Sequence, residues 1–183
     1  ACLAQVERCH IISYEDDCAL LQELFTHDGC GTLVANDDYE LSCEASIDDV
    51  GGILELIEPL EQQGALVKRS RELLETEISQ FRLLVRDGRI IACAALYPFL
   101  DDRCGEIACI VSHPDYRGGK RGQRLLKTLE QEARSQGLDR VFVLTTQTAH
   151  WFVEQGFVEA DQGALPSAKQ SLYNLQRNSK VFV

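Results

Sequence analysis

Residues 106–126 read EIACIVSHPDYRGGKRGQRLL, and this stretch decides the fold of the chain. Its first part, residues 107–111, is an apolar run of strand length, and Pro114 ends it. Glycines then open a loop, and beyond the loop apolar side chains recur at helical spacing, at Leu125, Leu126, Leu129 and Ala133. The stretch therefore predicts a strand, a glycine-rich loop and a helix, in that order.

The loop and the first turns of the predicted helix are strongly basic. Between residues 117 and 127 the chain has cations and no acid, although its formal net charge is -11. The first turn of a helix presents unpaired N–H groups and the positive end of the dipole, and glycines let backbone amides close on a phosphate. Cations at a helix start are unfavourable unless an anion binds there. We therefore predict a phosphate site, with a solvated basic helix face as the alternative.

Residues 112–122, SHPDYRGGKRG, resemble the acetyl-CoA pyrophosphate loop of the GNAT acetyltransferase superfamily. In that loop Arg or Gln is followed by two residues, Gly, one residue, and Gly or Ala; Arg117 and Gly122 match its ends, and Lys120 stands where Gly is usual. The resemblance implies an α/β GNAT fold, with a mixed, mostly antiparallel central sheet and helices on both faces. It also implies that acetyl-CoA, as co-substrate, is held by the strand end and the loop, at Cys109, Ile110, Val111, Ser112, Arg117, Gly118, Gly119, Lys120, Arg121, Gly122 and Gln123.

Segments on either side of the loop resemble the C-terminal half of the bacterial N-acetylglutamate synthase family. The matching segments are GEIAC at residues 105–109, VKRS at 67–70 and YNLQRNSK at 173–180. This resemblance implies an amino-acid N-acetyltransferase that moves acetyl from acetyl-CoA to the α-amine of L-glutamate by direct attack, the first step of arginine biosynthesis. It further implies that glutamate is held by Val67, Arg69, Cys109, Arg177 and Ser179.

Glu106 is the candidate general base. A carboxylate beside an apolar strand is costly to bury and usually faces solvent at a strand end, which is the alternative for this residue. If it faces a partly apolar groove instead, it can take a proton from an ammonium group, directly or through one water molecule. In the family that residues 105–109 resemble, this Glu is the proposed general base.

The departing CoA thiolate needs a proton donor. Thr145 and Thr146 end a predicted strand, where β-branched residues are common without any catalytic role. The resemblance places a hydroxyl donor in this segment, first of all at Thr145. Many GNAT enzymes instead use a tyrosine near the chain end, which here is Tyr173, so both residues are candidates.

Two arginines are the candidate carboxylate clamps. Arg69 lies between two predicted helices, and Arg177 lies near the last predicted strand with Ser179 two residues on, so these last two face the same way. A guanidinium can grip a carboxylate in a fork, and two separate arginines therefore suit a dicarboxylic acceptor. The alternative is that both are ordinary surface charges.

The composition is typical of a soluble cytoplasmic protein. With 183 residues, 45% of them apolar, the chain can bury a core. Its acidic balance argues against nucleic acid as a partner. The longest apolar run, residues 90–97, is too short to cross a membrane, and no secretory signal is visible. The eight cysteines have no Cys-x-x-Cys or zinc-finger spacing, so we expect reduced thiols and no metal.

The chain is expected to hold two parts. Residues 1–39 are predicted to be the C-terminal remnant of an amino-acid-kinase-like domain plus a linker, and residues 40–183 the GNAT domain. Residues 19–32 resemble the end of that kinase-like domain, which borders an arginine site in the family. The resemblance implies arginine regulation through an upstream domain and homo-oligomers of the full-length protein. Because the chain lacks methionine, we expect it to be a piece of a longer protein.

Capping signals place two helices after residue 45. Ser46 has Asp49 three positions on, which is a capping-box spacing, and an apolar stripe at helical spacing follows. Ser70 is expected to cap a second helix that turns Leu73, Leu74 and Ile78 inward. Asp87 and Gly88 lie between two apolar runs and predict a hairpin.

Two other functions stay open on the sequence alone. The same fold could acetylate a different amine, such as another amino acid or a protein N-terminus. Alternatively, the chain could be a non-catalytic regulatory module that binds CoA without turning it over.

Overall fold

The computed structural model describes residues 8–26, 29–35, 40–170 and 179–183. The chain divides into two compact units, one formed by Ala1–Leu41 with Arg86–Gly88 and the other by Ser42–Val85 with Arg89–Val183. Each unit is described by itself below. The assignment of the first part to a kinase-like domain stays a prediction.

The first unit is a small strand, helix and strand arrangement. Strand β1 (Arg8–Ile11) pairs antiparallel with β2 (Thr32–Ala35), and α1 (Ala19–Phe25) connects them. Ala19 on α1 is buried, but Leu24 and Phe25 on the same helix are 62% and 81% exposed. The described part of this unit therefore covers little of the apolar surface of its helix.

The second unit is built on one mixed sheet. Its strands are β3 (Leu41–Glu44), β4 (Phe81–Arg86), β5 (Arg89–Phe99), β6 (Cys104–Ser112), β7 (Arg140–Thr145), β8 (Glu159–Ala160) and β9 (Lys180–Phe182). Their order in the sheet is β3-β4-β5-β6-β7-β9-β8. Strands β6 and β7 run parallel, whereas β5–β6, β7–β9 and β8–β9 are antiparallel. The predicted mixed, mostly antiparallel sheet is confirmed.

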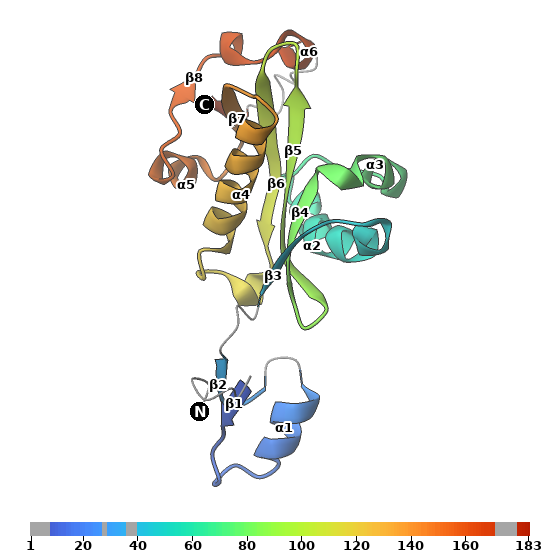
Figure 1. The fold of residues 1–183 in the computed structure, drawn as a ribbon, viewed down its shortest axis with the longest axis vertical. Helices are drawn as coiled ribbons and strands as arrows, with labels where there is room; N and C mark the ends of the chain where they lie inside the picture. Colours follow the sequence, from blue (N-terminus) through green and yellow to red (C-terminus); the bar gives the residue numbers. More distant parts are fainter. Residues whose placement is uncertain (1–7, 27–28, 36–39, 171–178) are drawn as a thin grey trace. The chain divides into compact units, whose positions relative to one another are not determined.

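Helices cover both faces of this sheet (Figure 1). On one face α4 (Arg121–Ser135) packs Leu125, Leu126 and Leu129 into a core that we call the α4-side core. On the other face α2 (Val50–Gln62) and α3 (Arg71–Glu77) form the α2-side core, which includes Ile53 and Leu74. Two further short helices, α5 (Ala149–Glu154) and α6 (Ser167–Gln170), lie near the end of the chain. The layers confirm the predicted fold class.

Helices α2 and α3 begin at the capping residues that were predicted from the sequence. Ser46 and Asp49 form a capping box at the 3-10 turn η2 (Ile47–Asp49), which leads directly into α2. The Ser70 hydroxyl accepts a hydrogen bond from the Leu73 N–H and caps α3. The prediction for the Leu73 side chain was wrong, because it is 43% exposed. Helix α3 has only seven residues before the 3-10 turn η3 (Ile78–Gln80), so one apolar row suffices to bury its inner side.

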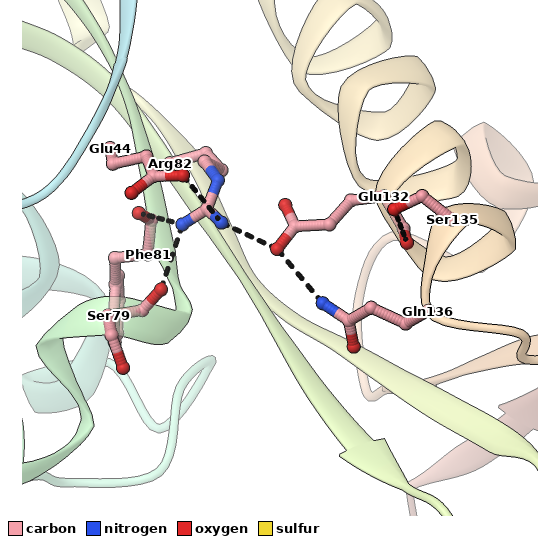
Figure 2. A network of polar contacts seen from close by, with 7 residues as sticks. All are labelled: Glu44, Ser79, Phe81, Arg82, Glu132, Ser135 and Gln136. Atoms are coloured by element: carbon pink, nitrogen blue, oxygen red, sulfur yellow. Dashed lines mark hydrogen bonds and ion pairs between the residues drawn. The ribbon is translucent and has the colours of Figure 1, made fainter.

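Arg82 forms ion pairs that link α4 to β3, the edge strand of the sheet (Figure 2). The Arg82 guanidinium on β4 lies 2.5 Å from the carboxylate of Glu132 on α4 and 3.4 Å from that of Glu44 on β3. Glu132 also accepts a hydrogen bond from the Gln136 side chain at 3.2 Å. The Arg82 side chain is 11% exposed, so this ion pair is largely screened from water.

Candidate active site

Strand β6 contains a bulge at Cys109. Ala95 pairs with Ala108 and Cys93 pairs with Val111, so Cys109 and Ile110 together stand opposite the single residue Ala94. Cys109 has a φ of 52°, in the left-handed region that non-glycine residues seldom adopt. The extra residue changes which side chains face each layer: Cys109 and Val111 pack in the α2-side core, and Ile110 packs against the α4-side core.

The pairing of β6 with β7 stops just before this bulge. Among the described residues of the two strands, the last register pair is Glu106 with Phe142. Strand β6 nevertheless continues to Ser112 and β7 to Thr145. The β7-facing edge of residues 107–112 therefore lacks a strand partner, and an extended ligand chain can hydrogen-bond to such an edge.

Glu106 is buried where the two strands part. It is the third residue of β6, is 7% exposed, and stands opposite Tyr97 in the antiparallel pair with β5. Its Oε2 lies 2.6 Å from the Lys169 Nζ on α6. The carboxylate is thus inside the second unit rather than at a solvent-facing strand end, and its role as general base stays a prediction.

Arg69 lies on the same side of the sheet as the bulge. Its backbone N–H donates to Glu61 Oε1 at 2.9 Å, and its Nη1 donates to the Val67 carbonyl at 3.1 Å. Burial works to lower the pKa of Arg69, but the neighbouring Cys109, Tyr97 and Glu77 raise it overall. The guanidinium therefore stays charged in a partly buried position, where a carboxylate ligand is a suitable partner.

Tyr97 and Glu77 complete the surroundings of Arg69. The Tyr97 hydroxyl donates to Glu77 Oε2 at 2.8 Å. Burial is the largest cause that raises the pKa of Tyr97 well above its usual range, with the Glu77 carboxylate adding to the effect. Tyr97 therefore keeps its proton and acts as a donor on this face. Neither residue was predicted from the sequence as part of the site.

The Cys109 thiol is not an activated nucleophile. Burial raises the pKa of this thiol to about 11, although Arg69 works in the opposite direction. A thiol with such a pKa is neutral near pH 7, and the thiolate is the reactive form. The Cys109 carbonyl is also engaged, because it accepts a weak hydrogen bond from the Cys93 thiol at 3.6 Å. An acyl-cysteine intermediate at Cys109 would need the thiolate, which this pKa disfavours.

The predicted phosphate loop leads into the start of α4. After the 3-10 turn η4 (Pro114–Tyr116), Gly118 has a φ of 87° and Lys120 a φ of 57°. Lys120 is the N-cap residue of α4 and adopts the left-handed conformation that glycine takes most easily. Residues 117–120 are exposed. The loop before α4 is thus exposed, and residues 117–120 include no acidic side chain.

Gly122 is closely packed in this first turn. A Cβ atom at Gly122 would lie 3.3 Å from Cζ2 of Trp151 and 3.6 Å from Cγ2 of Ile110. The absence of a side chain at Gly122 therefore lets α4 begin close to Trp151 and Ile110. Arg121 is held in the loop, since its Nη1 donates to the Tyr116 carbonyl at 2.5 Å and its guanidinium lies over the Tyr116 ring.

Thr145 is placed apart from Glu106. Strand alternation puts Thr145 on the side of Val143, which belongs to the α4-side core. The Thr145 hydroxyl lies 2.9 Å from the Thr148 hydroxyl and accepts the Thr148 N–H at 3.1 Å. These contacts cap the turn before α5, and a catalytic role for Thr145 stays a prediction.

The structure describes only some of the remaining predicted site residues. Tyr173 and Arg177 lie outside the described residues. Ser179 immediately precedes β9 and is partly buried. Val67 is 54% exposed, and its carbonyl already accepts the Arg69 side chain. The structure therefore brings Glu106, Cys109 and Arg69 to one face of the sheet. The Val67 side chain is exposed, and only its carbonyl contacts this group, through Arg69.

No group of three or more His, Cys, Asp or Glu side chains in the described part of the chain is arranged to hold a metal ion. Within the same residues, no helix has the length and apolar character needed to cross a membrane.

Comparison with known proteins identifies relatives of this site. A model of the acetyltransferase (GNAT) family matches residues 52–157. An amino-acid acetyltransferase of Pseudomonas fluorescens is 60% identical over 182 residues, which cover 100% of this chain and 42% of the relative. The chain thus spans less than half the length of that curated relative.

Two solved structures of one synthase resemble this chain in both sequence and fold. N-acetylglutamate synthase from Neisseria gonorrhoeae, complexed with coenzyme A and L-arginine, is 41% identical with a TM-score of 0.83, over 97% of this chain and 40% of the other. The same synthase complexed with coenzyme A and N-acetyl-glutamate is 42% identical with a TM-score of 0.77, over 97% and 42% of the two chains.

Proposed function

Because this chain belongs to the acetyltransferase (GNAT) family, we propose that it transfers acetyl from acetyl-CoA to the α-amine of L-glutamate. The observation that carries the proposal is the buried Glu106 beside the β6 bulge, on the same face as the Arg69 guanidinium. The relatives support it, since one is named amino-acid acetyltransferase and another is a synthase complexed with coenzyme A and N-acetyl-glutamate.

The donor would lie along β6 and over the start of α4. In the described part of the chain the edge of residues 109–112 has no strand partner, and it can pair with the extended pantetheine arm. The diphosphate would rest on the amides of the first turn of α4, within the segment from Arg117 to Gln123. The left-handed backbone at Gly118 and Lys120, in an exposed loop, fits such a group.

The acceptor would be held by its two carboxylates. Arg69 would grip one of them, with the main chain of Val67 and Cys109 beside it. Arg177 and Ser179 would grip the other. This arrangement requires a dicarboxylic acceptor, because a guanidinium and a carboxylate form a charge-assisted fork.

The chemistry proceeds by direct attack on the thioester. The α-ammonium gives a proton to Glu106, and the free amine then attacks the carbonyl carbon of the thioester. A C–N bond forms, the nitrogen loses its second proton to water, and the C–S bond breaks, which leaves N-acetylglutamate and the CoA thiolate. The thiolate takes a proton from Thr145 or Tyr173, or from water. The high pKa of the Cys109 thiol, about 11, favours this route over one through an acyl-cysteine.

Glutamate-dependent release of the CoA thiol tests the proposal. In the Glu106→Gln variant we expect turnover to fall by about 100-fold or more, because a general base contributes on that scale. Donor binding should be unchanged, and the only tryptophan, Trp151 beside Gly122, gives a fluorescence signal for it. The matched control is Glu159→Gln, which alters an exposed carboxylate paired with Lys180. Turnover near the wild-type value in Glu106→Gln at every pH would remove the assignment of the base.

A second measurement separates glutamate from other acceptors. The Arg69→Glu variant should reject glutamate while a monocarboxylic amino acid, if it is a substrate of the wild type, is affected much less. Donor binding with no glutamate-dependent thiol release in the wild type would favour a CoA-binding module instead. Arginine regulation, homo-oligomers and a cytoplasmic location of the full-length protein stay predictions.

A further inference from the structure

The ion pair between Lys169 and Glu106 differs from the surface ion pairs of the chain. Its Nζ–Oε2 distance is 2.6 Å, and the two side chains are 27% and 9% exposed. By comparison, both side chains of the Lys180–Glu159 pair are 55% exposed. Exposed pairs contribute little, whereas a pair in this partly dry environment interacts strongly. The Lys169 ammonium is thus an electrostatic partner of the proposed base.

The segment that carries Lys169 is held firmly in place. Leu165, which precedes α6, is 2% exposed and packs in a cluster with Cys104, Phe142 and Val181. Phe142 is the register partner of Glu106 on β7. The Lys169 backbone N–H donates to the Pro166 carbonyl at 2.8 Å, and the Gln170 side chain donates to the Leu165 carbonyl at 2.8 Å. The segment that leads to Lys169 is therefore anchored, through Leu165, on β6, which carries Glu106, and on its neighbour β7.

The other charged or titratable groups near Glu106 do not offer it a second close cation in the described part of the chain. From β5 it faces Tyr97, whose hydroxyl donates to Glu77, and from β6 it faces the neutral thiol of Cys109. Arg69 is engaged by the Val67 carbonyl and lies beside Tyr97, Cys109 and Glu77. Glu61, another acid near Cys109, accepts a hydrogen bond from the Arg69 backbone N–H. Lys169 is therefore the cation that offsets the burial of Glu106.

We propose that Lys169 is a positioning residue that keeps the Glu106 carboxylate ionised and oriented, with one oxygen bound to Lys169 and the other left for the ammonium of the acceptor. This inference rests on the proposed function of Glu106. A buried carboxylate without a cation binds a proton and can no longer accept one from the acceptor. The Lys169 ammonium contacts Glu106, so it acts through Glu106 and not on the substrate.

The test compares Lys169→Met with Lys169→Arg and with the control Lys180→Met. The first measurement needs no turnover: the carboxyl 13C resonance of Glu106, assigned with Glu106→Gln, is followed by NMR as the pH is varied. In Lys169→Met we expect the titration midpoint to rise by about one unit or more, as for the loss of an adjacent opposite charge. Lys169→Arg should restore a midpoint near the wild-type value, and Lys180→Met should leave it unchanged.

The second measurement is the pH profile of kcat/KM for glutamate. The acid-side midpoint in Lys169→Met should move upward by the same amount as the NMR midpoint, and Lys169→Arg should return it. A purely structural role would lower activity equally at all pH values and would leave the midpoint in place, which would overturn the inference. A wild-type chain that binds acetyl-CoA but releases no thiol with glutamate would refute the proposed function instead. The NMR comparison would then show separately whether Lys169 controls Glu106.

Discussion

Tyr97 and Glu106 are direct register partners across β5 and β6, so their side chains lie on the same face of the sheet. The Tyr97 hydroxyl donates to Glu77, and the Arg69 guanidinium lies beside both residues. Tyr97 on β5 therefore lies next to both the proposed base on β6 and the proposed carboxylate clamp, Arg69, in the segment between α2 and α3.

The first prediction concerns the Tyr97 hydroxyl. In Tyr97→Phe the hydrogen bond to Glu77 is lost and the Arg69 side chain loses a neighbour that holds it. We expect KM for glutamate to rise by up to about tenfold, which corresponds to the net contribution of one hydrogen bond. The value of kcat and the affinity for acetyl-CoA should change little. Steady-state kinetics with Tyr14→Phe, which alters a tyrosine that is 94% exposed, provides the control.

The second prediction concerns the tie between α4 and the sheet. In Arg82→Met the carboxylate of Glu132, which is 21% exposed, loses its charged partner (Figure 2). We expect the free energy of unfolding to fall by about 2 kcal/mol, because a partly buried charge is left without a cation. Urea unfolding followed by the fluorescence of Trp151 measures this change. Arg103→Met, which breaks an exposed pair with Asp139, should cost less than about 1 kcal/mol.

Much of the fold could be predicted because its signals are local. Pro114, the glycines of the loop and the helical spacing from Leu125 onwards all act within a few residues, and they placed β6, the loop and α4. The cap at Ser46 and the turn at Asp87 and Gly88, both with positive φ, were likewise readable from adjacent residues. Signals of this kind do not depend on what the segment packs against.

The bulge at Cys109 could not be read from the sequence. The run from Ile107 to Val111 has no glycine or asparagine that would indicate a left-handed residue. A regular strand would put Glu106 and Ile110 on one face, but the inserted residue puts Cys109 on the face of Glu106 and sends Ile110 to the other side. The strain at Cys109 is maintained by the packing of both cores, which is a tertiary effect.

Lys169 and Glu77 were missed for a different reason. Lys169 is 63 positions after Glu106, and Glu77 lies 20 positions before Tyr97. No periodic pattern connects residues so far apart, and a lone Lys or Glu on a short helix is usually an ordinary surface charge. Their roles depend on the strand order, which brings β5, β6 and β7 together.

The third prediction concerns the backbone cradle at Gly122. A methyl group there would meet Trp151 at 3.3 Å and Ile110 at 3.6 Å, so we expect it to displace the first turn of α4, whose amides are proposed to bind the diphosphate. We expect Gly122→Ala to weaken acetyl-CoA binding by about tenfold or more, an estimate based on the loss of one or two charge-assisted hydrogen bonds. Isothermal titration calorimetry measures the dissociation constant.

A matched glycine provides the control for this substitution. Gly51 lies in α2, and a Cβ there would have no neighbour within 4 Å. Gly51→Ala should leave acetyl-CoA binding unchanged and stabilise the chain by about 0.5–1 kcal/mol, because alanine loses less entropy in a helix. Equal affinities of Gly122→Ala and Gly51→Ala would argue against a diphosphate at the start of α4.

The fourth prediction concerns pH and the first unit. Glu23 on α1 accepts hydrogen bonds from His10 at 2.5 Å and from the N–H groups of Cys30 and Gly31 at 2.8 Å each. The bond from His10 is the largest cause that lowers the pKa of Glu23 from 4.5 to about 2, and the two backbone bonds add to it. The Glu23 carboxylate on α1 thus links β1, through His10, to the two residues Cys30 and Gly31 that precede β2.

The sign of the pH dependence follows from this lowered pKa. The folded form binds a proton on Glu23 less readily than the unfolded form, so the stability that Glu23 contributes is complete above pH 4.5 and is lost as the pH falls through about 2. We expect the amide resonances of Cys30 and Gly31 to titrate with a midpoint near 2 in NMR spectra, and Glu23→Gln to abolish that titration. A midpoint near 4.5 in the wild type would mean that the carboxylate is solvated and does not hold β2 in place.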